Sequence, residues 1–182
     1  MKTYMKERIT SAISGMKEEL VASLMSLVSI PAVSPLSVGG DEKRKAEFVE
    51  RICREIGFDE ILHYDAPSPL GPRPNLVAKL KGKNIRSGRL WVITHLDVVP
   101  AGDQNLWQGD PFKPELKNGR IYGRGTEDNG QDLIASLFAV KALKKLGLMP
   151  EREVCVAVVT DEETLKIIGD SGFFKDADNK EE

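Results

Sequence analysis

The stretch RLWVITHLDVVP, residues 89–100, places polar side chains directly after an apolar run rich in β-formers. Residues Arg89 to Thr94 predict a strand, which we expect in the centre of a sheet. Alternation along that strand puts one set of side chains on the same face: Trp91, Ile93, His95 and Asp97. Ligands of open α/β sheets bind beyond the carboxyl ends of the strands. The stretch therefore predicts both a sheet and a candidate site at its edge.

The rest of the chain alternates between helical and extended patterns. Apolar spacing predicts helices over Met5–Val28, Asp41–Gly57 and Asp132–Leu146, with the charge run of the second as its solvated face. Extended patterns occupy residues 58–64, 75–80, 120–122 and 154–159. The β-branched run Val154–Val159 is typical of a strand buried on both faces. This alternation indicates an α/β layered domain with a mixed, largely parallel sheet.

Composition narrows the class of protein. The 182 residues correspond to one domain, and a net charge of −2 offers no basic surface for nucleic acid or anionic membranes. The two cysteines, Cys53 and Cys155, lack the spacing of a disulfide framework or a cysteine zinc site. The longest apolar stretch, Leu20 to Val33, is interrupted by serines and a proline, so it predicts no membrane span. We therefore expect a reduced, cytoplasmic, soluble domain.

The first candidate pair is His95 and Asp97, two residues apart on one strand face. If His95 binds a metal ion through one ring nitrogen, the Asp97 carboxylate can accept the other N–H and fix the tautomer. The alternative is a histidine that a neighbouring carboxylate satisfies without any ligand.

The second candidate is Asp128, within the glycine-rich run GRGTEDNG at residues 123–130. A dinucleotide fingerprint would need glycine at position 128, where a carboxylate repels a pyrophosphate, so a nucleotide-binding module is disfavoured. Asp128 is either a helix cap or a metal ligand held by a turn that glycines shape.

The third candidate is the run TDEE, residues 160–163, directly after a buried strand. Thr160 and Glu163 have the spacing of a capping box. Two adjacent carboxylates at a strand end can also divide their roles, one binding a cation and the other acting as a base. Three strand ends thus deliver a histidine and carboxylates to one sheet edge, a donor set that suits zinc better than calcium.

These motifs, in this order, resemble the M20 family of metallopeptidases, which includes succinyl-diaminopimelate desuccinylase, acetylornithine deacetylase, aminoacylase and carboxypeptidase G relatives. The resemblance covers most of residues 20–164 and rests on HLDVVP (95–100), Trp107 with DPF (110–112), GRGTED (123–128) and DEE (161–163). It implies a zinc-peptidase-like catalytic domain with two zinc ions, or cobalt in their place. The implied substrates are N-acyl amino acids or small peptides with a free carboxylate.

The resemblance also implies residue roles. His95 would ligate one metal ion and Asp97 would orient it. Asp128 would bridge both ions, and the family allows a cis peptide between Asp128 and the next residue. Glu162 would be the general base that activates water, and Glu163 would ligate the other ion.

The resemblance ends after the paired glutamates. Family members continue through a further acidic ligand, a lid or dimerisation domain and a final histidine ligand, whereas here Thr164 is followed by LKII (165–168). We expect residues 1–164 to form a partial catalytic domain, incomplete at its C-terminal side, and residues 165–182 to form a divergent, frayed tail. The lid domain would be absent and turnover impaired. The alternative is a non-catalytic, metal-binding fragment that forms homo-oligomers through its exposed sheet surface.

Overall fold

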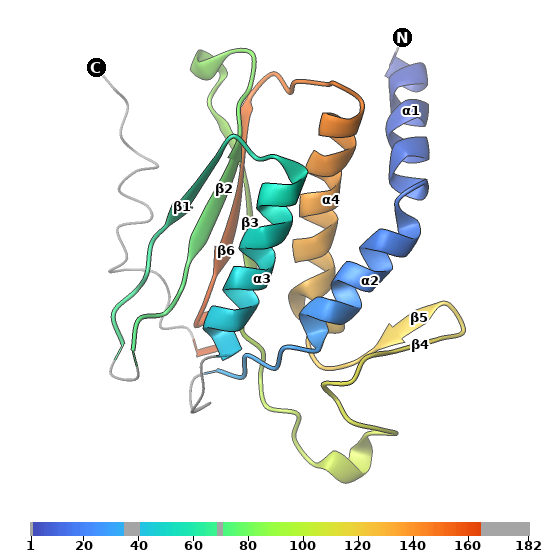
Figure 1. Cartoon of the computed structure of the whole chain (residues 1–182), viewed down its shortest axis with the longest axis vertical. Coiled ribbons are helices and arrows are strands. Elements are labelled where there is room, and N and C mark those ends of the chain that lie inside the picture. The colour runs from blue at the N-terminus through green and yellow to red at the C-terminus, as the bar shows by residue number, and fades with distance from the viewer. Residues whose placement is uncertain (1, 35–40, 69–70, 165–182) are drawn as a thin grey trace.

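A computed structural model describes residues 2–34, 41–68 and 71–164, so the predicted tail lies outside the described residues. The helices lie side by side along one face of a twisted sheet (Figure 1). The predicted α/β layering is confirmed. No helix within the described ranges has the length and apolar character needed to cross a membrane.

The larger sheet has four strands in the order β1 (Glu60–His63), β2 (Leu76–Leu80), β6 (Glu153–Val159), β3 (Arg89–His95). The pair β3–β6 is parallel, whereas β1–β2 and β2–β6 are antiparallel. The sheet is mixed, as predicted, but the prediction that it is largely parallel is wrong for the described strands. Only β3 and β6 are joined by a helical crossover, which parallel neighbours need, and β2 enters the sheet in the opposite direction.

The position of β3 also differs from the prediction. It lies at the edge of the described sheet, with only β6 as a neighbour. Leu90 and Ile93 are consequently 52% and 51% exposed. β6 lies between β2 and β3, and its last five residues are buried, which confirms the prediction of a strand covered on both faces.

The predicted first helix is two helices, α1 (Lys2–Ser14) and α2 (Lys17–Val28), which meet at a bend visible in Figure 1. Gly15 has a low helix propensity, and Met16 adopts a non-helical conformation. Met16, at the bend, is 5% exposed and packs in the core. The other two helices are α3 (Asp41–Ile56) and α4 (Gln131–Lys145), close to their predicted bounds.

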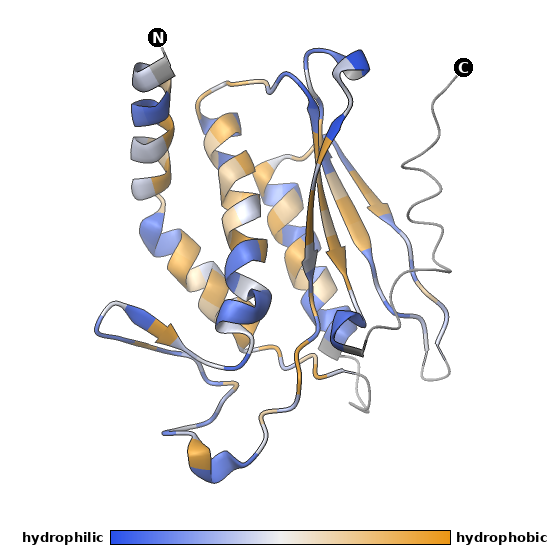
Figure 2. Ribbon diagram, turned by 180° about the vertical axis from the view of Figure 1, so that it is seen from behind, coloured by the Kyte–Doolittle hydropathy of each residue, from blue (hydrophilic) through white to orange (hydrophobic). Residues whose placement is uncertain are grey.

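The core lies between the helices and one face of the sheet. Its largest fully buried side chains include Phe138 and Leu137 of α4, Leu27 of α2 and Leu76 of β2. Most of the length of the strands is hydrophobic in Figure 2. One expectation for α3 is wrong, because Lys45 belongs to its charge run and is only 4% exposed.

A two-stranded hairpin, β4 (Glu115–Lys117) and β5 (Arg120–Tyr122), extends away from the larger sheet (Figure 1). The strand over residues 120–122 is confirmed, whereas β4 lies outside the extended patterns identified in the sequence. Asn118 and Gly119 both have positive φ, which is the conformation of a tight hairpin turn. The Asn118-Gly119 pair is a sequence signal that could have predicted this hairpin.

Candidate metal centre

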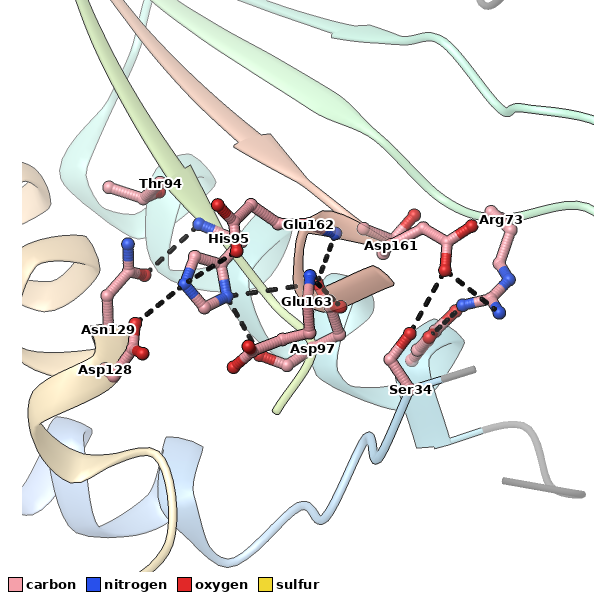
Figure 3. Close-up of polar contacts among 12 residues, drawn as sticks. Ser34, Arg73, Thr94, His95, Asp97, Asp128, Asn129, Asp161, Glu162 and Glu163 are labelled. Atoms are coloured by element: carbon pink, nitrogen blue, oxygen red, sulfur yellow. Dashed lines mark hydrogen bonds and ion pairs between the residues drawn. The ribbon is translucent and has the colours of Figure 1, made fainter. Parts of the chain in front are cut away.

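Three segments bring the candidate residues together at one edge of the sheet (Figure 3). His95 ends β3, Asp128 lies in the turn before α4, and Glu162 and Glu163 follow β6. Because β3 and β6 are parallel neighbours, their carboxyl ends meet at this edge. The backbone N–H of Leu96 donates to the carbonyl of Val159 over 2.7 Å, which continues the pairing into the site.

The imidazole of His95 is buried and held at both nitrogens. Its Nδ1 lies 2.9 Å from the backbone carbonyl oxygen of Asp97, and its Nε2 lies 3.0 Å from Oδ1 of Asp128. A carbonyl oxygen only accepts, so Nδ1 carries a proton, which leaves Nε2 as the nitrogen that would ligate a metal ion. The hydrogen bond expected between His95 and the Asp97 carboxylate does not form, because Oδ1 of Asp97 lies 3.8 Å from Nδ1.

The Asp97 carboxylate instead holds the turn that follows β6. It is fully buried, and its two oxygens accept the backbone N–H groups of Glu162 at 3.3 Å and of Glu163 at 3.2 Å. The predicted capping box is not formed, since the Thr160 hydroxyl oxygen has no hydrogen-bond partner among the described residues. A carboxylate two residues after β3 therefore takes the capping role that the sequence suggested for Thr160.

Asp128 does not cap α4. The residue before that helix is Gly130, with no side-chain cap, while the Asp128 carboxylate faces His95. The peptide bond between Asp128 and Asn129 is cis, as the family resemblance allows. The Asn129 side chain accepts the backbone N–H of His95 over 3.2 Å, so the turn is tied to the end of β3.

Glycines allow this turn to pack tightly. Gly125 has φ of 78°, and a Cβ atom there would lie 2.4 Å from Cγ1 of Val98. A Cβ atom on Gly130 would lie 2.6 Å from the carbonyl oxygen of Gly125. The glycine-rich run therefore shapes a support for Asp128, which was one of its two predicted uses.

The residues present fit a divalent metal ion. Single ligand atoms of His95, Asp128 and Glu163 all lie within 4.8 Å of one another. Burial raises the pKa of Glu163, and the nearby carboxylates of Asp128, Asp97 and Glu162 raise it further, against the effect of His95. A cation would relieve this crowding of negative charge. One imidazole and two carboxylates match the donor chemistry of zinc.

Beside these ligands lies a second polar cluster that sequence reasoning missed. Asp161 accepts from the Ser34 hydroxyl and pairs with Arg73, which also contacts Glu42 of α3 (Figure 3 labels the first three). Burial is the main cause that raises the pKa of Glu42 to about 7 and lowers that of Lys45 to about 8. No local pattern links these residues, because they come from separate segments of the chain that meet only in the fold.

A groove with a volume of about 540 Å³ lies beside the turn that carries Asp128. The loop at residues 106–113, the β4–β5 hairpin and the residues Thr126 and Glu127 line it. The three candidate ligands, His95, Asp128 and Glu163, do not line this groove. The groove is adjacent to the site and does not contain it.

An α/β domain that gathers one histidine and several carboxylates at the ends of adjacent strands has the architecture of a metallohydrolase. Residues 91–181 match the family described as Peptidase family M20/M25/M40, and the chain belongs to this family. The family suggested by the sequence motifs is confirmed.

Relatives and solved structures agree with this assignment. The chain is 36% identical over 154 residues to an uncharacterized metallohydrolase of Methanococcus maripaludis, which covers 80% of this chain and 36% of that protein. It is 28% identical over 167 residues to an N-formyl-4-amino-5-aminomethyl-2-methylpyrimidine deformylase of Halalkalibacterium halodurans. The match covers 91% of this chain and 37% of that protein. The structure of human carnosine dipeptidase 1 superposes with a TM-score of 0.75 at 25% identity. The match covers 88% of this chain and 36% of that chain. The chain thus spans little more than a third of the length of these proteins.

Proposed function

We propose that this chain carries the active-site residues of a hydrolase that uses a metal-activated water to cleave the amide bond of an N-acyl amino acid or a small peptide. The observation that carries the proposal is the convergence of His95, Asp128 and Glu163 within 4.8 Å. A relative named for removing a formyl group from nitrogen and a neighbour named as a dipeptidase support an amide-type bond as the target.

Each residue has a role that its geometry supports. His95, Asp128 and Glu163 would hold Zn²⁺, or Co²⁺ as a substitute, and in a complete site with two ions Asp128 would be the ligand that both share. A bound zinc ion lowers the pKa of water and polarises a carbonyl group. Asp97 orients His95 through its backbone carbonyl, and its carboxylate holds the turn after β6.

Glu162 is the general base in this proposal. Its Oε2 lies 3.9 Å from Nε2 of His95, and its side chain is 44% exposed. This carboxylate is therefore close to the candidate ligands and open to solvent, so it can take a proton from an attacking water and pass it to the leaving nitrogen.

The partners proposed are small molecules, an N-acyl amino acid or a short peptide, with no nucleic acid and no membrane. The two cysteines are free, buried thiols, and on that basis we propose the cytoplasm as the compartment.

The test is Glu162→Gln. With Zn²⁺ or Co²⁺ supplied, we expect weak hydrolysis of a panel of N-acyl amino acids and dipeptides by the wild-type chain. The variant should lose at least about 100-fold of that rate, because the proton acceptor is gone, while its metal content stays the same. Glu127→Gln, at a glutamate in the neighbouring turn, is the matched control and should keep the rate. Hydrolysis that survives Glu162→Gln would show that the base is assigned wrongly.

A second candidate is a non-catalytic, metal-binding chain that associates with its own copies. One edge of β3 has no neighbouring strand among the described residues, and its half-exposed Leu90 and Ile93 favour this candidate. Bound metal without hydrolysis of any substrate in the panel, together with a dimer or larger species in light scattering, would support this candidate over the first.

A further inference from the structure

We propose that Arg73 is a positioning residue for the metal centre, because it holds Asp161 and thereby aims the two following glutamates at His95. The inference rests on the proposed function, in which Glu162 and Glu163 act at that centre. Arg73 lies in the loop between β1 and β2 and belongs to neither β3 nor β6, which carry the candidate site.

Asp161 has a backbone conformation that side-chain contacts must support. Its φ is 67°, in the left-handed region that few residues other than glycine occupy. Its Oδ1 accepts the Ser34 hydroxyl over 3.1 Å and lies 3.6 Å from a terminal guanidinium nitrogen of Arg73. The direction of the chain at Asp161 determines where the next two side chains point.

Arg73 is itself rigidly placed. Its side chain is 11% exposed and contacts the carboxylate of Glu42. Its backbone makes two hydrogen bonds with Ala66, N–H to O at 2.8 Å and O to N–H at 2.9 Å. Arg73 is therefore held both at its backbone, by Ala66, and at its guanidinium, by Glu42.

Asn75 adds a second anchor two residues along the same loop. Its amide nitrogen donates to the carbonyl of Tyr64 over 2.9 Å, and its amide oxygen accepts the backbone N–H of Thr160 over 2.9 Å. Asn75 thus fixes the residue before Asp161, and Arg73 fixes Asp161 itself. Together they determine the course of the chain as it leaves β6.

Charge makes Arg73 hard to replace. A planar guanidinium can serve two carboxylates at once, here Glu42 and Asp161, which a single ammonium group does less well. Without that cation, the poorly exposed carboxylates of Glu42 and Asp161 would lose the partner that they share. We expect the turn to move away from them and to take Glu163 out of reach of His95.

The experiment is a Co²⁺ titration of the full chain, followed by the visible absorption of the bound ion and by competition with a chelating dye. Arg73→Met should weaken Co²⁺ binding by about 10–100-fold, the usual cost of losing a residue that supports a ligand. It should also change the absorption spectrum, because a displaced carboxylate alters the ligand geometry. Arg73→Lys should recover part of both properties.

Arg89→Met is the matched control. Arg89 pairs with Glu153 over 2.8 Å at the opposite end of β3, so its loss should lower stability without changing Co²⁺ affinity or the spectrum. Asp161→Asn tests the same contact if Arg73→Met does not fold, since asparagine tolerates positive φ and keeps an acceptor for Ser34. It should weaken Co²⁺ binding as well.

Two outcomes separate this inference from the function on which it rests. If wild-type protein binds Co²⁺ but Arg73→Met or Asp161→Asn matches it in affinity and spectrum, the positioning role is overturned and the proposed metal centre stands. If wild-type protein binds no Co²⁺, the proposed function fails and the positioning role fails with it.

Discussion

The Nδ1 atom of His95 lies 2.9 Å from the backbone carbonyl oxygen of Asp97, two residues further along the chain. This contact is part of the backbone path that leaves β3, so it does not depend on the chemistry of the Asp97 side chain. It fixes the tautomer of the imidazole and leaves Nε2 directed at Asp128. The carboxylate of Asp97 serves a different purpose, which is to hold the turn after β6.

Asp97→Asn separates these two functions. We expect the imidazole of His95 to keep its proton on Nδ1. The affinity for a divalent metal should fall by about 10-fold, because an amide has one acceptor oxygen for the two backbone N–H groups that the carboxylate binds. Nitrogen chemical shifts of the two histidines, with His63→Ala to assign them, report the tautomer. A shift of the proton to Nε2 in the variant would show that the carboxylate controls it.

Gly125→Ala tests the tight packing of the turn that carries Asp128. A methyl group there would clash with Val98, and the residue has positive φ. Gly102 also has positive φ, at 74°, but lies in open space, so Gly102→Ala isolates the backbone cost. We expect Gly102→Ala to lower the free energy of unfolding by about 1 kcal/mol and Gly125→Ala to lower it by at least about 2 kcal/mol. Equal losses in urea denaturation would contradict the clash.

Lys45 should make stability depend on alkaline pH. Burial lowers its pKa to about 8 from an ordinary value of 10.5, so between these limits the unfolded chain holds more protons at this site than the folded chain. The free energy of unfolding should therefore rise with pH across this window, by up to about 3 kcal/mol from this residue. Below pH 8 the cost of burying the charged lysine is fully present.

Urea denaturation at pH 7.5 and pH 10 measures this effect as the difference between wild type and Lys45→Met. The variant should lack the rise that Lys45 contributes. Lys43→Met, at an exposed lysine on the same helix, is the control and should follow the wild type. Identical pH dependence in all three proteins would contradict the burial of a charged Lys45.

The two thiols should be unreactive in the folded chain. Cys53 and Cys155 are both fully buried, and burial raises the pKa of each to about 12. We expect a thiol reagent at pH 8 to label neither residue within minutes and to label both after addition of urea, because the thiolate is the reactive form. Rapid labelling of one thiol in native protein would mean that its region opens readily.

The edge of β3 that no other described strand covers predicts self-association. Replacing Leu90 and Ile93 together with lysine should reduce any dimer seen by light scattering, because charge on an edge strand opposes pairing. Leu116→Lys, at a similarly exposed residue of the β4–β5 hairpin, should leave the molar mass unchanged. An unchanged dimer in the double variant would place the contact elsewhere.

Sequence patterns predicted most of the elements, because buried strands and amphipathic helices have clear periodicity. The candidate site followed from two strands, since His95 is the last residue of β3 and the glutamates come shortly after β6. The bend at Gly15 was missed because the apolar spacing continues across it. The edge position of β3 was missed because strand order depends on which strands are neighbours, and an apolar run does not reveal that.

The supporting charges were out of reach for a physical reason. Lys45 is one cation of a charge run on a helix, and Arg73 lies in a proline-rich loop, and in both settings exposure is the ordinary outcome. Charges far away in the sequence compensate them, Asp97 for Lys45 and both Glu42 and Asp161 for Arg73. Only the folded arrangement shows that these charges compensate one another.

The most direct test of the metal centre is the zinc content of the dialysed chain, measured together with its molar mass, for wild type, His95→Ala and His63→Ala. We predict bound zinc in the wild type, about two ions per chain if the complete site assembles. His95→Ala should lose the bound zinc. His63→Ala should retain it, because His63 lies on β1 and pairs with Glu50 of α3, away from the site. A wild-type chain without zinc, or zinc that survives His95→Ala, would contradict a metal centre built on His95.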